Sequence, residues 1–303
     1  MAKFIVYTYQ FGPIVPEEQM LPFEPETPID ADALMARKGE IFEQIFADFK
    51  RVRIFEGKES EPKPLPIEGV NNKQFILFHL GDPKQIDLVE ISEEGKFVHS
   101  SAPSAPHCLI IIDNRKDVQR IYIEKKRAAF NANTDSIAKI LERSFNCQLR
   151  KEHLYMKINH EYSSTAFWNF IRSRQHGIKS IIFQIPYPNL PRVSDNVEEL
   201  LKKLNKSANS DATLKLEAAK KSILSGVAPD NPYINGLVEA SAQSGAIISV
   251  KGAGDRGYTQ CGKKEHKSMD LPEGISNLTQ EDFSNSNLFN DTSDALASLL
   301  PKS

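Results

Sequence analysis

Two acidic residues and a lysine near the middle of the chain are of the types that cleave phosphodiesters with a metal ion. Asp113 ends a predicted strand, and Glu124 stands two residues before Lys126 on the strand that follows. Carboxylates bind Mg²⁺, and a neighbouring lysine stabilises the phosphate under attack. These three residues are the catalytic candidates, with Mg²⁺ as the cofactor if they act.

The helix, strands, helix and strand predicted around them resemble the core of PD-(D/E)xK nucleases, which implies a metal-dependent nuclease. Hairpin geometry opposes this interpretation. A two-residue turn at Arg115-Lys116 pairs Asp113 with Val118 and leaves Glu124 six residues further along the strand. At about 3.3 Å per residue the separation is on the order of 20 Å, too far to share a metal. We therefore expect no metal site and no catalytic set.

Basic residues surround the turn of the same hairpin. Between residues 115 and 127, six basic residues outnumber two acids. A basic hairpin with an aromatic residue can follow phosphates and stack on a base. The alternative is a solvated surface without a partner. The predicted nucleic-acid-binding residues are Arg115, Lys116, Arg120, Tyr122, Lys125, Lys126 and Arg127.

Residues 252–257 read Gly-Ala-Gly-Asp-Arg-Gly, the glycine spacing of a dinucleotide-binding loop. Such a loop must open a helix whose N-terminus faces the pyrophosphate. The residues that follow contain glycines, a proline and no helical periodicity. The segment is therefore predicted to be a turn between strands at 246–251 and 256–262, and no dinucleotide is expected. The seven histidines show no spacing typical of a metal site, and no nucleophile motif is present.

Composition limits the remaining classes. The 303 residues, 40% apolar and 26% charged, are typical of a globular protein with one large domain or two ordinary ones. Cys108, Cys147 and Cys261 form no CxxC pair, which favours a reducing cytoplasm. No apolar run approaches the roughly 20 residues of a membrane helix, so no membrane partner is expected. The net charge is −2, and acids dominate from Asp270 onward.

The elements that position the candidate residues are clearest between 107 and 185, where we expect the hydrophobic core. A hairpin, a helix, a strand, a second helix and a strand follow one another there. Alternation places one apolar set on the core face of the hairpin, namely Cys108, Ile110, Ile112, Ile121 and Ile123. The other face carries Leu109, Ile111, Arg120 and Tyr122, and could lie against a loop, a helix or a ligand. The run at 178–185 is typical of a central strand.

Outside this stretch, a strand is predicted at 3–11 and a helix from Asp30 or Asp32 to about residue 49. Residues 73–80 and 85–92 are expected to form a hairpin, with a third strand at 95–100. Two helices are predicted between 194 and 224 from their Lys, Glu and Ala content. A further helix follows Asn231 and ends at Gly245.

These elements predict an α+β fold with a mixed, mainly antiparallel sheet, packed helices, a helical C-terminal region and a disordered acidic tail. The expected domains are a core at 1–192 with proline-rich excursions at 13–28 and 59–70, a helical region with a C-terminal strand pair packed on that core at 193–274, and the tail at 275–303. The tail could cover the basic hairpin when no ligand is bound.

The function predicted from these features is a cytoplasmic binding protein that contacts DNA, RNA or a protein partner through the basic hairpin at 115–127. One alternative is the nuclease. The other is a scaffold subunit of a bacterial complex, whose proline-rich segments and tail contact other chains. The opening strand and the helix–strand–Pro-Asn order resemble uncharacterised proteins of bacterial anti-phage loci. That resemblance implies antiviral defence and assigns no role to any residue.

Overall fold

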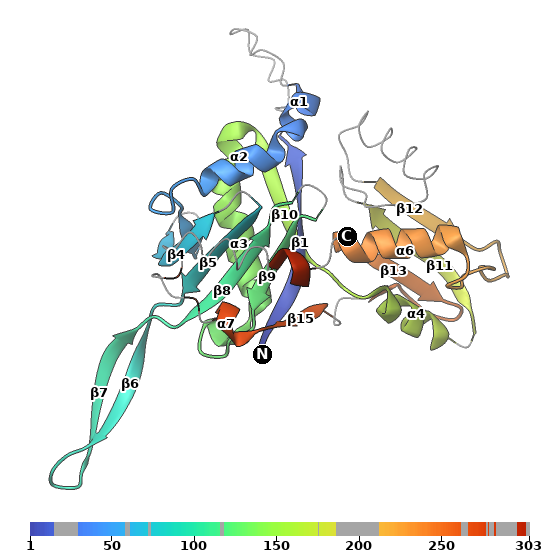
Figure 1. Ribbon diagram of the computed structural model, residues 1–303. Helices are drawn as coiled ribbons and strands as arrows, with labels where there is room; N and C mark the ends of the chain where they lie inside the picture. The colour runs from blue at the N-terminus through green and yellow to red at the C-terminus, as the bar shows by residue number, and fades with distance from the viewer. Residues whose placement is uncertain are drawn as a thin grey trace. The chain divides into compact units, whose positions relative to one another are not determined.

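The chain divides into two compact units (Figure 1). Unit 1 comprises residues 1–5, 32–153 and 269–303, and unit 2 comprises residues 6–31 and 154–268. The computed structural model describes residues 1–14, 30–57, 61–71, 74–115, 118–174, 176–185, 212–261, 266–276, 278, 282 and 296–300. The predicted α+β class is confirmed.

Unit 1 is built on antiparallel strands in the order β9 (Arg120–Glu124), β8 (His107–Asp113), β5 (Phe75–Gly81) and β4 (Ile67–Asn71). Strand β1 (Ala2–Pro13) begins in this unit, where the Lys125 N–H donates to the Lys3 carbonyl at 2.8 Å. Almost every residue of β5, β8 and β9 is buried. Buried strands read as near-continuous apolar runs, which is how β5 and β8 appear in the sequence, whereas β9 begins with Arg120 and ends with Glu124.

Helices α2 (Lys38–Ile45) and α3 (Thr134–Leu149) pack against one face of this sheet. Phe46 stacks on Phe78 of β5, with ring centroids 6.0 Å apart, and meets Phe145 of α3 edge to face. Phe78 pairs with Ile110, so the helices cover the face that carries Ile110. The residues predicted to face the core are accordingly buried there: Cys108, Ile110, Ile112, Ile121 and Ile123.

The register of the β8–β9 hairpin differs from the prediction by two residues. Asp113 pairs with Arg120, not with Val118, because β8 ends at Asp113 and β9 begins only at Arg120. A shift by two residues preserves the alternation of side chains. The faces were therefore predicted correctly although the register was wrong.

The predicted hairpin of residues 73–80 and 85–92 is wrong. Strand β5 pairs with β4 and β8, whereas β6 (Lys84–Ile91) pairs with β7 (Phe97–Ser104) around residues 92–96. This β6–β7 ribbon projects from the rest of unit 1 (Figure 1). The segment expected to be a second proline-rich excursion contributes β4 and also β3 (Lys63–Leu65), which pairs with β2 (Ile54–Glu56). Long-range pairing therefore replaced the local pairing that we expected.

In unit 2, the remainder of β1 pairs antiparallel with β10 (Leu154–His160). A separate antiparallel sheet has the order β12 (Ala212–Glu217), β11 (Ile178–Ile185), β13 (Ile248–Gly252) and β14 (Thr259–Cys261). As predicted, β11 is a central strand. Helices α4 (Ser164–Arg172) and α6 (Pro232–Ser244) pack on one face of this sheet (Figure 1).

Helix α6 has the predicted boundaries. The Asn231 side chain accepts hydrogen bonds from the N–H groups of Tyr233 and Ile234, and Gly245 ends the helix with φ of 66°. The helix predicted over 212–224 is wrong, because residues 212–217 form β12. Leu214 and Leu216 alternate with polar residues there, and this period of two matches a half-buried strand. The helix predicted near 194–206 lies outside the described residues, as does most of the segment 13–28.

The remaining described elements are short. They are α1 (Ala31–Ala36), 3-10 turns at Phe130–Ala132 and Arg150–Glu152, β15 (Ser268–Leu271), which pairs with β1, and α7 (Glu273–Ser276). Most of the predicted tail lies outside the described residues, but Ile275, Leu296 and Leu300 within it are buried. Among the described ranges, no helix has the length and apolar character needed to span a membrane.

Candidate functional site

The three catalytic candidates are not brought together. The Asp113 side chain is fully buried and accepts hydrogen bonds from Arg115 Nε at 2.8 Å and Arg115 Nη2 at 2.6 Å. Glu124 is also buried, and its carboxylate accepts from the Leu109 N–H at 2.9 Å. With the observed register the two acids stand four residues apart along the paired strands, about 13 Å at 3.3 Å per residue. Each carboxylate has a structural partner.

The predicted nucleic-acid-binding residues divide into buried and accessible groups. Arg120 and Tyr122 are 4% and 1% exposed, within β9. Arg115 is held by Asp113, and its guanidinium lies 5.1 Å from the centre of the Phe75 ring. Lys116 lies outside the described residues. The accessible part is the segment 125–127, in which Lys125 and Arg127 are exposed and Lys126 is half-buried.

Two titratable groups near this segment remain neutral at pH 7. Burial, with smaller contributions from His107 and Lys126, lowers the pKa of His79 to about 4. On the opposite face of the sheet, burial raises the pKa of the Cys108 thiol to about 12, and Glu124 adds to the effect. A protonated thiol is a poor nucleophile. The surroundings of segment 125–127 therefore provide no activated nucleophile among these groups.

The glycine-rich segment is a hairpin turn, as predicted. Val250 of β13 pairs with Thr259 of β14, so the chain reverses between them and enters a strand where a dinucleotide-binding loop would open a helix. The Asp255 carboxylate accepts the Gly252 N–H at 2.9 Å and also pairs with Arg174 at 3.1 Å. These contacts hold the turn in place.

The unit 2 sheet has one apolar and one polar face. The apolar face packs under α4 and α6 through residues such as Ile181, Phe183 and Val250. Register and alternation place the intervening residues on the opposite face. That polar face consists of Ser180, Ile182 and Gln184 on β11, Thr213, Lys215 and Glu217 on β12, Ser249 and Lys251 on β13, and Gln260 on β14.

Tyr258 extends over this polar face from the turn before β14. Its hydroxyl donates to Ser180 Oγ at 3.1 Å, and Ser180 Oγ donates to the Leu216 carbonyl at 2.9 Å. The side chain remains 41% exposed. Beside it, the hydrogen bond from Lys215 lowers the pKa of Glu217, and Lys179 and Lys251 add weaker Coulombic effects. The face thus combines a positioned aromatic ring with cationic side chains.

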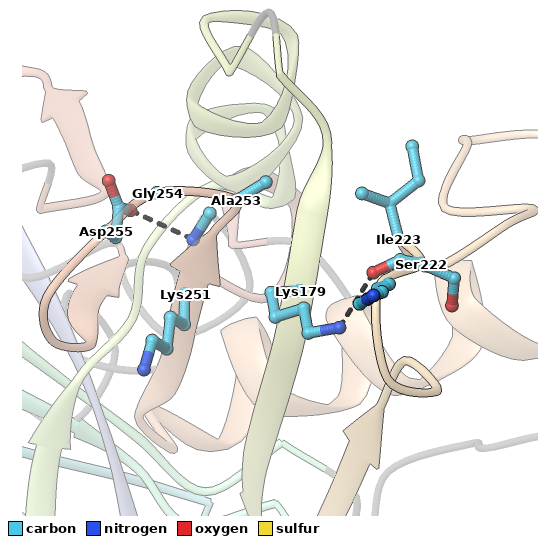
Figure 2. A pocket seen from close by; sticks show the side chains of 9 residues that line it. Lys179, Ser222, Ile223, Lys251, Ala253, Gly254 and Asp255 are labelled. Carbon is cyan, nitrogen blue, oxygen red and sulfur yellow. Dashed lines mark hydrogen bonds between the residues drawn. The ribbon is translucent and has the colours of Figure 1, made fainter.

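A depression of about 570 Å³ lies where β11 begins and β13 ends, between the glycine-rich turn and residues 221–223 (Figure 2). Lys179, Lys221 and Lys251 line it, and Lys251 also belongs to the polar face. Sequence reasoning missed this site because its lysines are far apart in the chain. The alternation of residues 212–217 was a local signal for a two-faced sheet, and β13 alternates in the same way.

No curated protein matches this chain. A family model described as a domain of unknown function, DUF4747, matches residues 115–294. The matched range contains β9, α3 and β10 together with the whole unit 2 sheet and its two helices. Because the match spans more than half of the 303 residues, the chain belongs to the DUF4747 family.

Proposed function

We propose that this protein binds single-stranded nucleic acid on the polar face of the sheet β12-β11-β13-β14. The observation that carries the proposal is Tyr258, an exposed ring held across that face by its hydrogen bond to Ser180. Stacking of a base on an aromatic side chain contributes about 1–3 kcal/mol and is available to unpaired bases. A ring fixed in advance loses little conformational freedom when a base stacks on it.

The charges around Tyr258 support the same ligand. Lys215 and Lys251 lie on the polar face, and Lys179 lines the depression at the strand ends. Glu217 offsets Lys215, with which it forms an ion pair at 2.6 Å. Lysines placed along a surface neutralise successive phosphates and release counterions, so binding weakens as salt increases.

The exposed segment 125–127, in unit 1, is a separate candidate surface for phosphates. Lys125 and Arg127 are accessible to phosphates, whereas Tyr122 is not accessible to a base. Phosphodiester cleavage forms no part of the proposal, because Asp113 and Glu124 are held by Arg115 and the Leu109 N–H. The buried thiols of Cys108 and Cys261 support a reducing compartment such as the cytoplasm.

The test is fluorescence anisotropy with a labelled single strand of about 12 nucleotides, a length within the usual site sizes, and with the corresponding duplex. We expect the single strand to bind more tightly than the duplex. Tyr258→Ala should weaken binding by roughly 5- to 150-fold, the range that follows from loss of one stacked base. Tyr258→Phe should retain most of the affinity because the ring remains.

Tyr233→Ala is the matched control, since Tyr233 is 60% exposed but lies on α6, which packs on the other face of the sheet. If Lys125→Ala/Arg127→Ala abolishes binding while Tyr258→Ala has no effect, the segment 125–127 is the binding surface and the proposed face is wrong. Absence of binding to any nucleic acid at low salt would reject the function itself.

A second candidate is a protein partner bound by the β6–β7 ribbon. Ile91 and Phe97 are cross-strand neighbours, each 71% exposed, and Val89 lies next on the same face at 54%. Exposed apolar clusters of this kind mark interaction surfaces. The ribbon also carries the acids Asp87, Glu90, Glu93 and Glu94 against Lys84 and Lys96. The partner proposed is a different protein with an apolar groove bordered by basic residues.

Crosslinking of the full chain in its host lysate, followed by reconstitution with the purified crosslinked protein, tests this second candidate. We expect Ile91→Ser/Phe97→Ser to weaken the reconstituted complex at least about tenfold, as for two apolar anchors of an interface. Leu299→Ser, at a 44% exposed site elsewhere in unit 1, is the control. Self-association lost in the double variant would instead identify a second copy as the occupant and reject this proposal.

A further inference from the structure

The depression at the glycine-rich turn has the features of a site for a phosphate group. Its lining comes from the ends of two paired strands and from the segment 221–223 (Figure 2). The pairing of β11 and β13 shifts between Ile178 and Ser180, and this irregularity includes Lys179, which lines the depression. Pockets of about 300–1,000 Å³ hold small ligands, so the observed 570 Å³ has room for a nucleotide.

One of the three lysines is held in position by the backbone. Lys179 Nζ donates to the Ala219 carbonyl at 2.7 Å. It also donates to the Ser222 carbonyl at 2.8 Å (Figure 2). An ammonium group has three donors, so one remains for a ligand. Lys221 and Lys251 have no carboxylate partner among the residues that the structure describes. Their charges are therefore available to an anion.

The single acid in the lining does not cancel these charges. The Asp255 carboxylate pairs with Arg174 at 3.1 Å and accepts the Gly252 N–H at 2.9 Å. Arg174 is itself fixed, with its guanidinium 4.6 Å from the centre of the Phe170 ring. Asp255 and Arg174 offset each other, and three lysines remain around the cavity. The site therefore favours a ligand with more than one negative charge.

We propose that this depression binds a phosphate monoester, and that its physiological source is the terminal phosphate of a nucleic-acid strand on the polar face. A monoester carries about −1.5 to −2 charges at pH 7, whereas each internal phosphodiester carries −1. Lys251 joins the depression to the polar face, so a strand that ends beside Lys251 directs its terminal phosphate into the cavity. The assignment to a strand end rests on the proposed function, and the phosphate site itself does not.

The experiment uses the full chain and three internally labelled single strands with the same sequence. One has a 5′-phosphate, one a 3′-phosphate and one two hydroxyl ends. We expect one phosphorylated strand to bind at least about tenfold more tightly than the hydroxyl-ended strand, as for a charge-assisted contact. Lys221→Gln should abolish that preference and leave hydroxyl-ended binding unchanged. Lys220→Gln, at an exposed neighbouring lysine outside the depression, should preserve it.

A calorimetric titration with adenosine monophosphate and with inorganic phosphate tests whether the depression binds a small phosphate compound or the terminal phosphate of a strand. If no strand binds but either small phosphate binds in a Lys221-dependent manner, the phosphate site stands and the strand-end assignment is rejected together with the proposed function. If hydroxyl-ended and phosphorylated strands bind equally and neither small phosphate binds, the phosphate site is rejected and the proposed function is unaffected.

Discussion

At the scale of single residues, several charged side chains of the β8–β9 hairpin are buried and make contacts within the protein instead of facing solvent. Asp113 and Glu124 were candidate catalytic residues and Arg120 a candidate nucleic-acid-binding residue, yet each is less than 10% exposed. Asp113 binds Arg115 through both carboxylate oxygens, and Glu124 binds the Leu109 N–H. Buried charges persist where they have partners of this kind, so removal of one partner is costly.

Asp113→Ala tests the buried ion pair. The substitution leaves the Arg115 guanidinium, whose side chain is only 15% exposed, without its carboxylate. We expect the free energy of unfolding to fall by about 3 kcal/mol, the usual cost of breaking a buried pair. Urea denaturation measures the change. Glu217→Ala removes the carboxylate of an exposed pair and should leave the midpoint unchanged. An equal effect of both substitutions would contradict the structural role of Asp113.

His79 makes a prediction about acid stability. Its folded-state pKa of about 4 lies below the ordinary value of 6.5, so the unfolded chain binds more protons between these pH values. The contribution of His79 to stability is therefore complete above pH 6.5 and is lost as the pH falls towards 4. The loss is on the order of 3 kcal/mol. In His79→Gln the urea midpoint should change less between pH 6.5 and pH 4 than in the wild type. In His99→Gln, on the exposed β6–β7 ribbon, the midpoint should depend on pH as in the wild type.

At the scale of elements, two glycines have backbone conformations that other residues rarely adopt: Gly245, at the C-terminal end of α6, and Gly254, in the turn between β13 and β14. Gly245 adopts φ of 66°, and an added Cβ there would lie 2.5 Å from Asn159 Cβ and 2.9 Å from the His160 carbonyl oxygen. Gly254 also has a positive φ, of 90°, but no atom lies within 4 Å of an added Cβ. A Cβ at Gly254 would therefore cause only backbone strain, whereas a Cβ at Gly245 would cause backbone strain and steric overlap.

Alanine at each position measures the two effects. Gly254→Ala should cost about 1–2 kcal/mol, the penalty of a left-handed conformation for a residue with a Cβ. Gly245→Ala should cost more than about 3 kcal/mol, because overpacking against β10 adds to that penalty. Thermal unfolding of the two variants gives the comparison. If they were equally stable, the close approach of Gly245 to Asn159 would be wrong.

Elements with strong local signals could be predicted from the sequence, and pairings between distant segments could not. Helix α6 was predicted because Asn231 and Gly245 mark its ends, and the faces of β8 and β9 because alternation survives a two-residue shift. The partners of β5 are β4 and β8, and the second lies some 30 residues away. The polar face depends on the register of four strands, so no local pattern could have joined Tyr258, Ser180 and Lys251.

At the scale of the whole molecule, the chain passes between its units at residues 5–6, 31–32, 153–154 and 268–269. Neither unit is one continuous segment. Strand β1 contributes to both, and its later part supplies the partner of β10. The family match at 115–294 begins after β8. It therefore omits β8, the partner of β9 in unit 1, and β1, the partner of β10 in unit 2.

A fragment spanning 115–294 should consequently fold in part. The apolar cluster of Trp168, Phe183 and Val250 draws its members only from residues 162–261, so we expect a cooperative urea transition reported by Trp168, the sole tryptophan. Helix α3 packs on a sheet that lacks β5 and β8 in this fragment. Its amides should exchange at least about tenfold faster than in the full chain, as locally unfolded segments do. Hydrogen-exchange mass spectrometry measures these rates. If the α3 amides exchanged as slowly in the fragment as in the full chain, this dependence would be contradicted.

The divided path of the chain also has a consequence for its synthesis. Strand β1 ends at Pro13 and β10 starts at Leu154, so roughly 140 residues must be translated before β1 meets that partner. At about 5–20 residues per second, the interval is on the order of 10–30 s. Ten of the twelve residues of β1 are buried in the folded protein. A nascent chain therefore carries an apolar, unpaired strand at its leading end, the kind of segment that ribosome-associated chaperones shield, and slower elongation should increase its aggregation.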